Sequence, residues 1–206
     1  MSLTIEEACI KLNNKECLIL PSDTLYGLAA RAYDNDAIEK IFEIKNRPEE
    51  KKLPIHYSSL KQMENDIEIN PFIEKLAKHF WPGALTIVTN KKPTSQLQKI
   101  EETVGIRIPN HAMLLKIIEK IGPICMPSAN RSNETPFNQF HAIQESFQKH
   151  GINLNGICDD IAIGKTASTI IEITNTEENS AIRKKPTLLR SGSIAFEEIL
   201  SVWNTI

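Results

Sequence analysis

Apolar positions near the N-terminus switch between the spacing of a helix and the unbroken run of a buried strand. Thr4 and Glu7 form a capping-box pattern, and apolar residues then follow at helical spacing. Residues 17–20 form a short apolar run that stops at Pro21, which predicts a buried strand. Helical spacing returns over about residues 36–45, so a second helix is predicted there.

The middle of the chain carries the clearest boundary signals. Residues 53–57 are strand-like, and Pro54 indicates either an edge strand or a strand start, because proline has no N–H to give to a neighbouring strand. Asn70 and Pro71 are a strong helix start, since asparagine caps free N–H groups and proline suits the first helical position. We expect this helix to end at the Trp-Pro-Gly sequence of residues 81–83.

The second half of the chain continues the alternation of helices and strands. The predicted strands are residues 84–90, 103–109, 123–126, 156–159, 168–174 and 181–190, and the predicted helices are residues 111–122, 138–150 and 196–203. The elements follow no strict β-α-β order, and no repeat or linker divides the chain. We therefore predict a single domain over residues 1–206, of the α+β class with α/β-type layers, in which helices flank a twisted mixed sheet.

Composition narrows the class of protein. Apolar residues make up 41% of the chain and charged residues 24%, which supports a folded core. The net charge of −2 argues against a protein held on nucleic acid by bulk charge alone. The sequence shows neither an apolar run of about 18 residues nor a signal-peptide pattern, so we expect a cytoplasmic protein without a membrane segment. The four cysteines lie far apart without a C-x-x-C pattern, which predicts reduced core thiols rather than a zinc site.

A partial phosphate-binding motif has to be set aside first. Gly164, Lys165 and Thr166 match the end of a P-loop, but the position that should hold its first glycine is Asp159. A P-loop also needs a helix to begin at the Lys-Thr pair, so that N–H groups face the phosphates. Residues 168–173 are β-branched and strand-like instead. The sequence therefore argues against a P-loop.

Polar residues stand at the ends of several predicted strands and helices, each against an apolar background. Singly they are ordinary, because a strand-end serine is usually a turn residue and a lone histidine in a strand is more often packed than reactive. Taken together they indicate a polar pocket. The set consists of Ser22, Asp23, Thr24, Lys45, Arg47, His56, Arg107, Ser128, Asn130, Ser168 and Arg190.

This set, in this order, resembles the YrdC/Sua5 family of threonylcarbamoyl-adenylate synthases. The stretch LPSDTLYGL is similar to the family pattern P-T-D-T-x-Y-G-L, and KNRPEEKKLPIHY is similar to its K-x-R-P segment leading to a strand with histidine. The remaining similar blocks are WPGALTIV, VGIRIPNH, PSANRSN, STIIEI and LLRSGSI. The blocks span residues 20–194, which is nearly the whole chain.

Four positions depart from the family pattern. Ser22 replaces a threonine and keeps the hydroxyl, whereas Pro127 stands where a threonine is common. Asn133 replaces a glycine, which the loop can accept because asparagine tolerates a left-handed backbone. Lys51 stands where a neutral polar residue is common. Asp23 has two open interpretations, a ligand contact or an Asx-turn.

The resemblance implies the formation of threonylcarbamoyl-AMP and pyrophosphate from L-threonine, bicarbonate or CO2, and ATP. Guanidinium groups suit phosphates and carboxylates, so Arg47 and Arg190 would bind phosphate and Arg107 the threonine carboxylate. The implied catalytic residues are Lys45 and Arg47, the implied L-threonine contacts are Thr24, His56, Arg107 and Ser168, and the implied ATP contacts are Arg47, Lys51, Thr103, Ser128, Asn130, Asn138 and Arg190.

The resemblance also implies cofactors and partners. Mg²⁺ would arrive with ATP and be held largely by phosphate and water, so no protein metal ligands are predicted. The product would pass to a tRNA-modifying threonylcarbamoyltransferase complex for t6A synthesis. The basic loop over residues 47–52 is either a lid over ATP or a solvated charged loop.

Two alternatives stay open from the sequence. One is a carbamoyl-adenylating paralogue with another acceptor, similar to the homologous domain of hydrogenase-maturation proteins. The other is a non-catalytic RNA-binding protein in tRNA or ribosome maturation. For the latter, contact with tRNA or double-stranded RNA would involve Lys91, Lys92 and residues 183–185.

Overall fold

The computed structural model describes residues 2–205 except 49, 160–163, 165 and 175–184. Its described strands form one sheet in the order β7-β1-β2-β6-β3-β5-β4-β8-β9, with both parallel and antiparallel pairs. The strands are β1 (Leu18–Leu20), β2 (Gly27–Arg31), β3 (Pro54–His56), β4 (Leu85–Asn90), β5 (Thr103–Arg107), β6 (Ile124–Cys125), β7 (Asn155–Gly156), β8 (Thr169–Glu172) and β9 (Thr187–Arg190).

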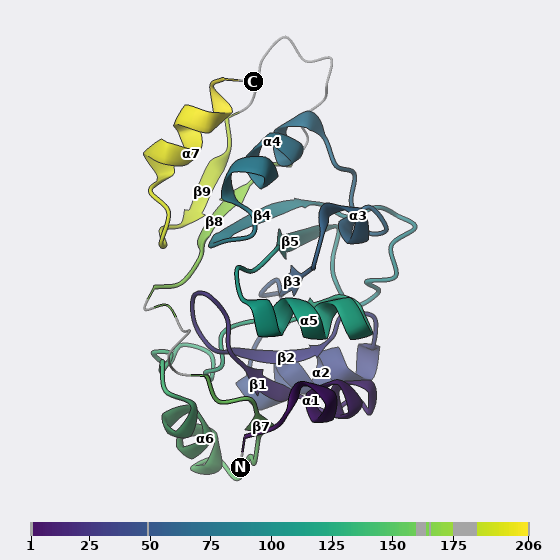
Figure 1. Ribbon diagram of the computed structural model, residues 1–206, viewed down its shortest axis with the longest axis vertical. Coiled ribbons are helices and arrows are strands. Elements are labelled where there is room, and N and C mark those ends of the chain that lie inside the picture. The colour runs from purple at the N-terminus through teal and green to yellow at the C-terminus, as the bar shows by residue number, and fades with distance from the viewer. Residues whose placement is uncertain (1, 49, 160–163, 165, 175–184, 206) are drawn as a thin grey trace.

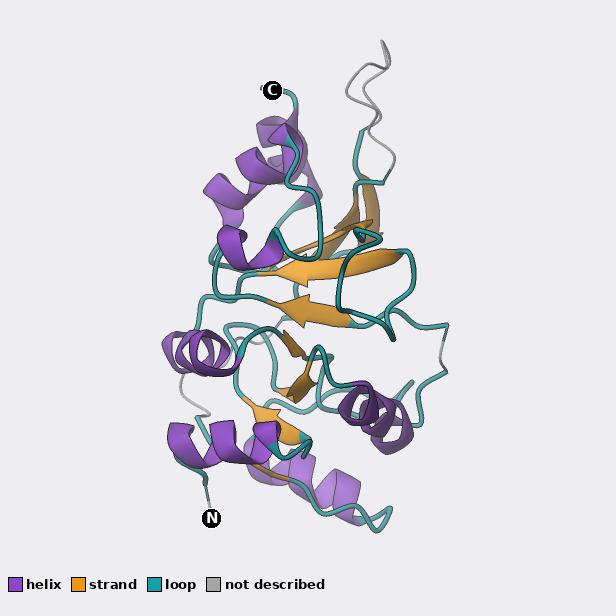
Figure 2. Cartoon of the chain, turned by 90° about the vertical axis from the view of Figure 1, so that its right-hand side faces the viewer, coloured by secondary structure: helices purple, strands orange, loops and turns teal. Residues whose placement is uncertain are grey.

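Helices lie on both sides of the sheet, as Figures 1 and 2 show. They are α1 (Ile5–Asn13), α2 (Asn35–Lys45), α3 (Leu60–Met63), α4 (Pro71–Phe80), α5 (Ala112–Ile121), α6 (Phe140–Gln148) and α7 (Phe196–Trp203). The prediction of a mixed sheet flanked by helices is confirmed. In the part of the chain that the structure describes, no helix is long and apolar enough to cross a membrane.

Local sequence signals explain where the helices begin and end. The Thr4 hydroxyl accepts a bond from the Glu7 N–H at 3.3 Å while the Glu7 carboxylate accepts one from the Thr4 N–H at 2.8 Å, so the predicted capping box forms. Asn70 caps α4 by accepting from the Ile73 N–H at 2.9 Å. Gly122, at φ 90°, ends α5 in a backbone conformation that glycine adopts without strain.

Two buried clusters hold the helices against the sheet. One packs α1 and α5 on the strands near the N-terminus. The larger cluster includes α2, α4 and α7, and there Phe72 and Trp203 stack with their ring centroids 4.4 Å apart. The polar turn between β1 and β2 and the ends of β3, β5 and β8 therefore rest on an apolar frame.

The sequence did not predict two elements, β2 and α3. The residues of β2, Gly27 to Arg31, include glycine and alanines with weak strand preference, and the strand forms because it pairs with both β1 and β6. The strand predicted for 156–159 lies at Asn155–Gly156. The strand predicted for 181–190 lies at Thr187–Arg190, and residues 181–184 lie outside the described residues.

Candidate functional site

A cavity of about 760 Å³ lies where polar residues from several strands converge. The turn between β1 and β2, the loop after α2, and strands β3, β4, β5, β8 and β9 all contribute to its walls. The polar residues singled out in the sequence that line it are Ser22, Thr24, Arg47, Lys51, His56, Arg107, Ser128, Ser168 and Arg190. The structure thus brings together side chains spread over most of the sequence.

Arg107 lies at the centre of one wall and is 3% exposed. Its guanidinium donates from Nε to the Gly83 carbonyl at 2.9 Å, from Nη1 to the Thr24 hydroxyl at 2.9 Å, and from Nη2 to the Asp23 carboxylate at 2.7 Å. A guanidinium has five N–H groups, so one N–H on each terminal nitrogen is left for a ligand. Asp23 therefore acts as the ion-pair partner of Arg107.

Ser22 shapes the turn that presents Thr24. Its hydroxyl donates to the Leu25 carbonyl at 2.6 Å and accepts from the Thr24 N–H at 3.2 Å. The two hydroxyl oxygens of Ser22 and Thr24 lie 3.1 Å apart. Ser22 is thus a turn-forming residue, and it directs the Thr24 hydroxyl towards Arg107.

His56 lies in strand β3 and is one of the residues that line the cavity. It pairs in register with Arg107 across the parallel strands β3 and β5 and is 3% exposed. Burial, followed by the charge of Arg107, lowers the pKa of His56 to about 3, so its ring is neutral at pH 7. Its Nδ1 atom is buried and has no hydrogen-bond partner among the described residues.

Ser168 belongs to a hydroxyl cluster beside β8. Arg190 donates from Nη2 to the Ser168 hydroxyl at 3.0 Å and to its carbonyl at 2.8 Å. The hydroxyl of Thr86 lies 2.9 Å from that of Ser168, and both residues line the cavity. A Cβ placed on Gly192 would lie 2.4 Å from the Ser168 carbonyl carbon, so only glycine allows this close packing. Sequence reasoning missed Thr86, although it stands in the quoted block WPGALTIV.

The loop after α2 forms the basic wall of the cavity. Arg47 donates from Nε to the Lys51 carbonyl at 3.2 Å and from Nη2 to the Lys52 carbonyl at 2.7 Å, which folds the loop around its guanidinium. The Lys51 amine donates to the Asn133 side chain at 3.1 Å, and Asn133 has the left-handed φ of 69°. Burial lowers the pKa of Arg47. Two of the four departures from the family pattern, Lys51 and Asn133, are thus in contact.

Some predicted site residues do not line the cavity. Lys45 is 1% exposed, and its amine donates to the carbonyls of Ser128 and Asn130, at 2.5 Å in each case. The Asn130 side chain accepts from the Ser128 hydroxyl at 2.6 Å, behind the wall that Ser128 forms. Thr103 accepts a bond from the Lys52 amine, and Asn138 lies exposed in a loop.

The charge of the cavity wall favours an anionic ligand. The cations that line it are Arg47, Lys51, Lys52, Arg107 and Arg190, and none of its lining residues in the described chain is an aspartate or glutamate. Among the same residues no group of three or more histidine, cysteine, aspartate or glutamate side chains is placed to hold a metal ion. Arginine and lysine in such a wall suit phosphate and carboxylate oxygens.

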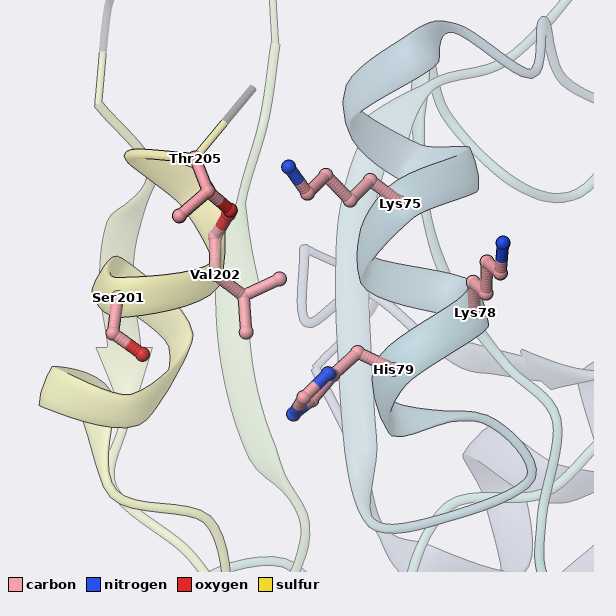
Figure 3. Close-up of a pocket in the computed structure, with 6 residues that line it drawn as sticks. All are labelled: Lys75, Lys78, His79, Ser201, Val202 and Thr205. Atoms are coloured by element: carbon pink, nitrogen blue, oxygen red, sulfur yellow. The ribbon is translucent and has the colours of Figure 1, made fainter.

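Two other candidates carry no comparable chemistry. A second cavity, of about 550 Å³, lies between α4 and α7. In Figure 3 the Lys75 amine and the His79 ring point towards α7, and Lys78 points away. None of its lining residues is buried. No helix follows the partial P-loop motif in the described residues, where strand β8 begins at Thr169. Gly164 packs tightly against the backbone carbonyl of Asp23. Lys165 lies outside the described residues.

Comparison with known proteins agrees with this arrangement. The family model Sua5/YciO/YrdC, described as "Telomere recombination", matches residues 11–192. A threonylcarbamoyl-AMP synthase of Bacillus subtilis is 35% identical over 96% of this chain and 56% of its own length. One from Pyrococcus abyssi is 37% identical over 88% of this chain and 52% of its own length. The chain thus spans about half the length of these relatives.

A solved structure extends the similarity to three dimensions. The crystal structure of P. abyssi Sua5 complexed with L-threonine has a TM-score of 0.80 and 36% identity to this chain, covering 96% of this chain and 56% of that one. The match includes the strands and turns that form the cavity. The chain belongs to the Sua5/YciO/YrdC family.

Proposed function

We propose that this chain is an L-threonylcarbamoyladenylate synthase, an enzyme of the nucleotidyltransferase type. The observation that carries the proposal is the cavity itself. Arg107 and the hydroxyl of Thr24 belong to one wall, and the basic loop at Arg47 forms another. Such a cavity has groups for a carboxylate and a hydroxyl beside groups for a triphosphate. The relatives named threonylcarbamoyl-AMP synthase and the threonine complex of P. abyssi Sua5 support the same substrates.

The threonine subsite would form around Arg107. Its two remaining N–H groups suit the substrate carboxylate, and the neutral ring of His56 lines the same cavity. The hydroxyls of Thr24 and Ser168 lie in the same cavity. A site with such polar partners rejects an analogue lacking the matching group, because its own buried groups would then be unsatisfied.

The adenylation step needs positioning and charge more than a covalent intermediate. A carbamate oxygen of N-carboxythreonine, formed from L-threonine and bicarbonate or CO2, would attack the α-phosphorus of ATP. The new O–P bond forms as the bond to the β-phosphate oxygen breaks, and pyrophosphate leaves. Arg47, Lys51 and Arg190 would neutralise the phosphate oxygens.

Mg²⁺ would accompany ATP as part of this proposal. None of the described residues that line the cavity is an aspartate or glutamate, and Asp23 beside it is already paired with Arg107. Phosphate oxygens and water would therefore supply the metal's ligands, as is usual for Mg²⁺ bound with a nucleotide. We further propose that the protein acts in the cytoplasm and that its product passes to a tRNA-modifying threonylcarbamoyltransferase complex.

Pyrophosphate release from ATP by the purified protein tests the proposal. L-threonine and bicarbonate are omitted in turn, and release should require both. Arg107→Lys keeps one charge but loses the guanidinium fork, so we expect release to fall by about tenfold or more. Lys75→Arg, in the second cavity, is the control and should not change release.

The other outcomes distinguish the alternatives. Release that needs bicarbonate but not threonine would indicate a different carbamoyl acceptor. Absence of release under every combination, together with salt-dependent binding of tRNA, would contradict the synthase and favour an RNA-binding protein.

A further inference from the structure

Lys45 has surroundings that differ from those of a phosphate-binding lysine. It closes α2, is 1% exposed, and does not line the cavity. Its ammonium donates to the carbonyls of Ser128 and Asn130 at 2.5 Å in both bonds. An ammonium has three N–H donors, so two of the three are used by these carbonyls.

Burial makes the charged form of the Lys45 amine unfavourable. Burial, followed by the nearby charge of Arg47, lowers the pKa of Lys45 to about 7. Among the described residues no carboxylate forms an ion pair with it. The two carbonyl bonds are therefore what satisfies a buried charge, and they fix the peptide groups that supply them.

The same contacts join two separate chain segments into one wall. The Ser132 N–H donates to the Lys45 carbonyl at 2.8 Å, so Lys45 holds the turn after β6 through both its side chain and its backbone. The Asn130 amide closes that turn by donating to the Arg131 carbonyl at 2.8 Å and to the Glu134 carbonyl at 2.7 Å. Ser128, at the front of the turn, faces the cavity.

We propose that Lys45 is a positioning residue whose ammonium holds the Ser128–Asn130 turn in place as the adenosine side of the nucleotide site, and that it does not contact the phosphates. The ligand named here, an adenine nucleotide, rests on the proposed function. Lys45 is 1% exposed and does not line the cavity, so its amine could reach a phosphate only if the side chain moved, and that movement would strain its bonds to the two carbonyls. Arg47, Lys51 and Lys52 already present cations to the cavity.

Binding of adenosine and of ATP separates the two roles. In Lys45→Met the turn loses its anchor, so both ligands should bind about tenfold or more weakly, by a similar factor. Weaker ATP binding with unchanged adenosine binding would show a phosphate contact and overturn the proposal. Lys40→Met is the matched control: it lies on the same helix, is exposed, and bonds to the Lys15 carbonyl. It should change neither affinity.

Hydrogen exchange tests the anchor without any ligand. In Lys45→Met the amide of Ser132 should exchange about tenfold faster than in the wild type, whereas amides of β4 and β5 keep their rates. An unchanged Ser132 rate would contradict the proposal. This readout does not depend on turnover, so a protein that releases no pyrophosphate still gives a clear answer.

A wild-type measurement covers the case in which the variant does not fold. The ¹⁵N signal of the Lys45 ammonium, followed by NMR in selectively labelled protein, should respond equally to adenosine and to ATP. A shift seen with ATP alone would place the amine on the phosphates and overturn the proposal.

Discussion

The buried ion pair between Asp23 and Arg107 predicts that Asp23→Asn, which replaces one carboxylate oxygen by an NH2 group, lowers the stability of the protein strongly. The two groups lie 2.7 Å apart with side-chain exposures of 14% and 4%. Asp23→Asn keeps the size of the side chain and one acceptor oxygen but removes the negative charge. The guanidinium of Arg107 would stay buried with the neutral acceptors Gly83 and Thr24.

The magnitude follows from burial. At 2.7 Å the Coulomb energy of the pair is about 6 kcal/mol with an effective dielectric constant of about 20. Measured losses on breaking a buried pair are about 3–5 kcal/mol. Because asparagine keeps one hydrogen bond and the Asp23 side chain is 14% exposed, we expect Asp23→Asn to lower the free energy of unfolding by about 2–4 kcal/mol.

A matched surface pair supplies the control. Lys15 and Asp36 also lie 2.7 Å apart, but their side chains are 49% and 67% exposed. Asp36→Asn should leave stability unchanged within error, because water screens an exposed pair. Urea unfolding of both variants at pH 7 measures the difference. Equal stability losses in the two variants would refute the argument that burial sets the energy of the Asp23 pair.

Three further predictions concern His56, Gly192 and Tyr57. The pKa of His56 falls from 6.5 to about 3 on folding, so below pH 6.5 the unfolded chain binds a proton that the folded protein does not. The free energy of unfolding should therefore fall by about 2 kcal/mol between pH 7.5 and pH 5. His56→Asn should remove this contribution of about 2 kcal/mol to the pH dependence. Urea midpoints at both pH values measure it, and an equal acid response in the variant would contradict it. Gly192→Ala should raise the KM for threonine more than the KM for ATP, because the Cβ of the new alanine would displace Ser168. Equal KM values in the variant and the wild type would contradict this and show that the backbone adjusts. Tyr57→Phe removes the 2.9 Å hydrogen bond from the Tyr57 hydroxyl to the buried Asp66 carboxylate. It should lower the free energy of unfolding in urea by about 1–3 kcal/mol without changing pyrophosphate release. Unchanged stability would mean that water replaces the bond.

The sequence predicted helix ends well because these signals are local. The capping box at Thr4 and the Asn70-Pro71 start each act within one turn of backbone, and both helices begin where expected. Strand β2 has no such signal, because its glycine and alanines become a strand only through pairing with β1 and β6. The four-residue helix α3 is too short to show a helical period.

Residue identity also predicted which segments meet, but not how each side chain points. A lysine at the end of a helix has the same sequence signature whether its amine faces solvent, phosphate or carbonyls. Only the packing of α2 against the turn after β6 turns Lys45 inwards. The role of Asp23 was similarly undecided, because its partner Arg107 lies far away in sequence and meets it only in the fold.

Charge gives the last argument about function, since total charge and local charge differ. The chain carries −2 overall, yet the cavity wall gathers five cations, Arg47, Lys51, Lys52, Arg107 and Arg190. Of the basic residues considered for RNA contact, Lys91 and Lys92 do not line this cavity, and Arg183 and Lys184 lie outside the described residues. These five cations thus line a cavity of about 760 Å³, a volume that suits a small anionic substrate rather than a duplex.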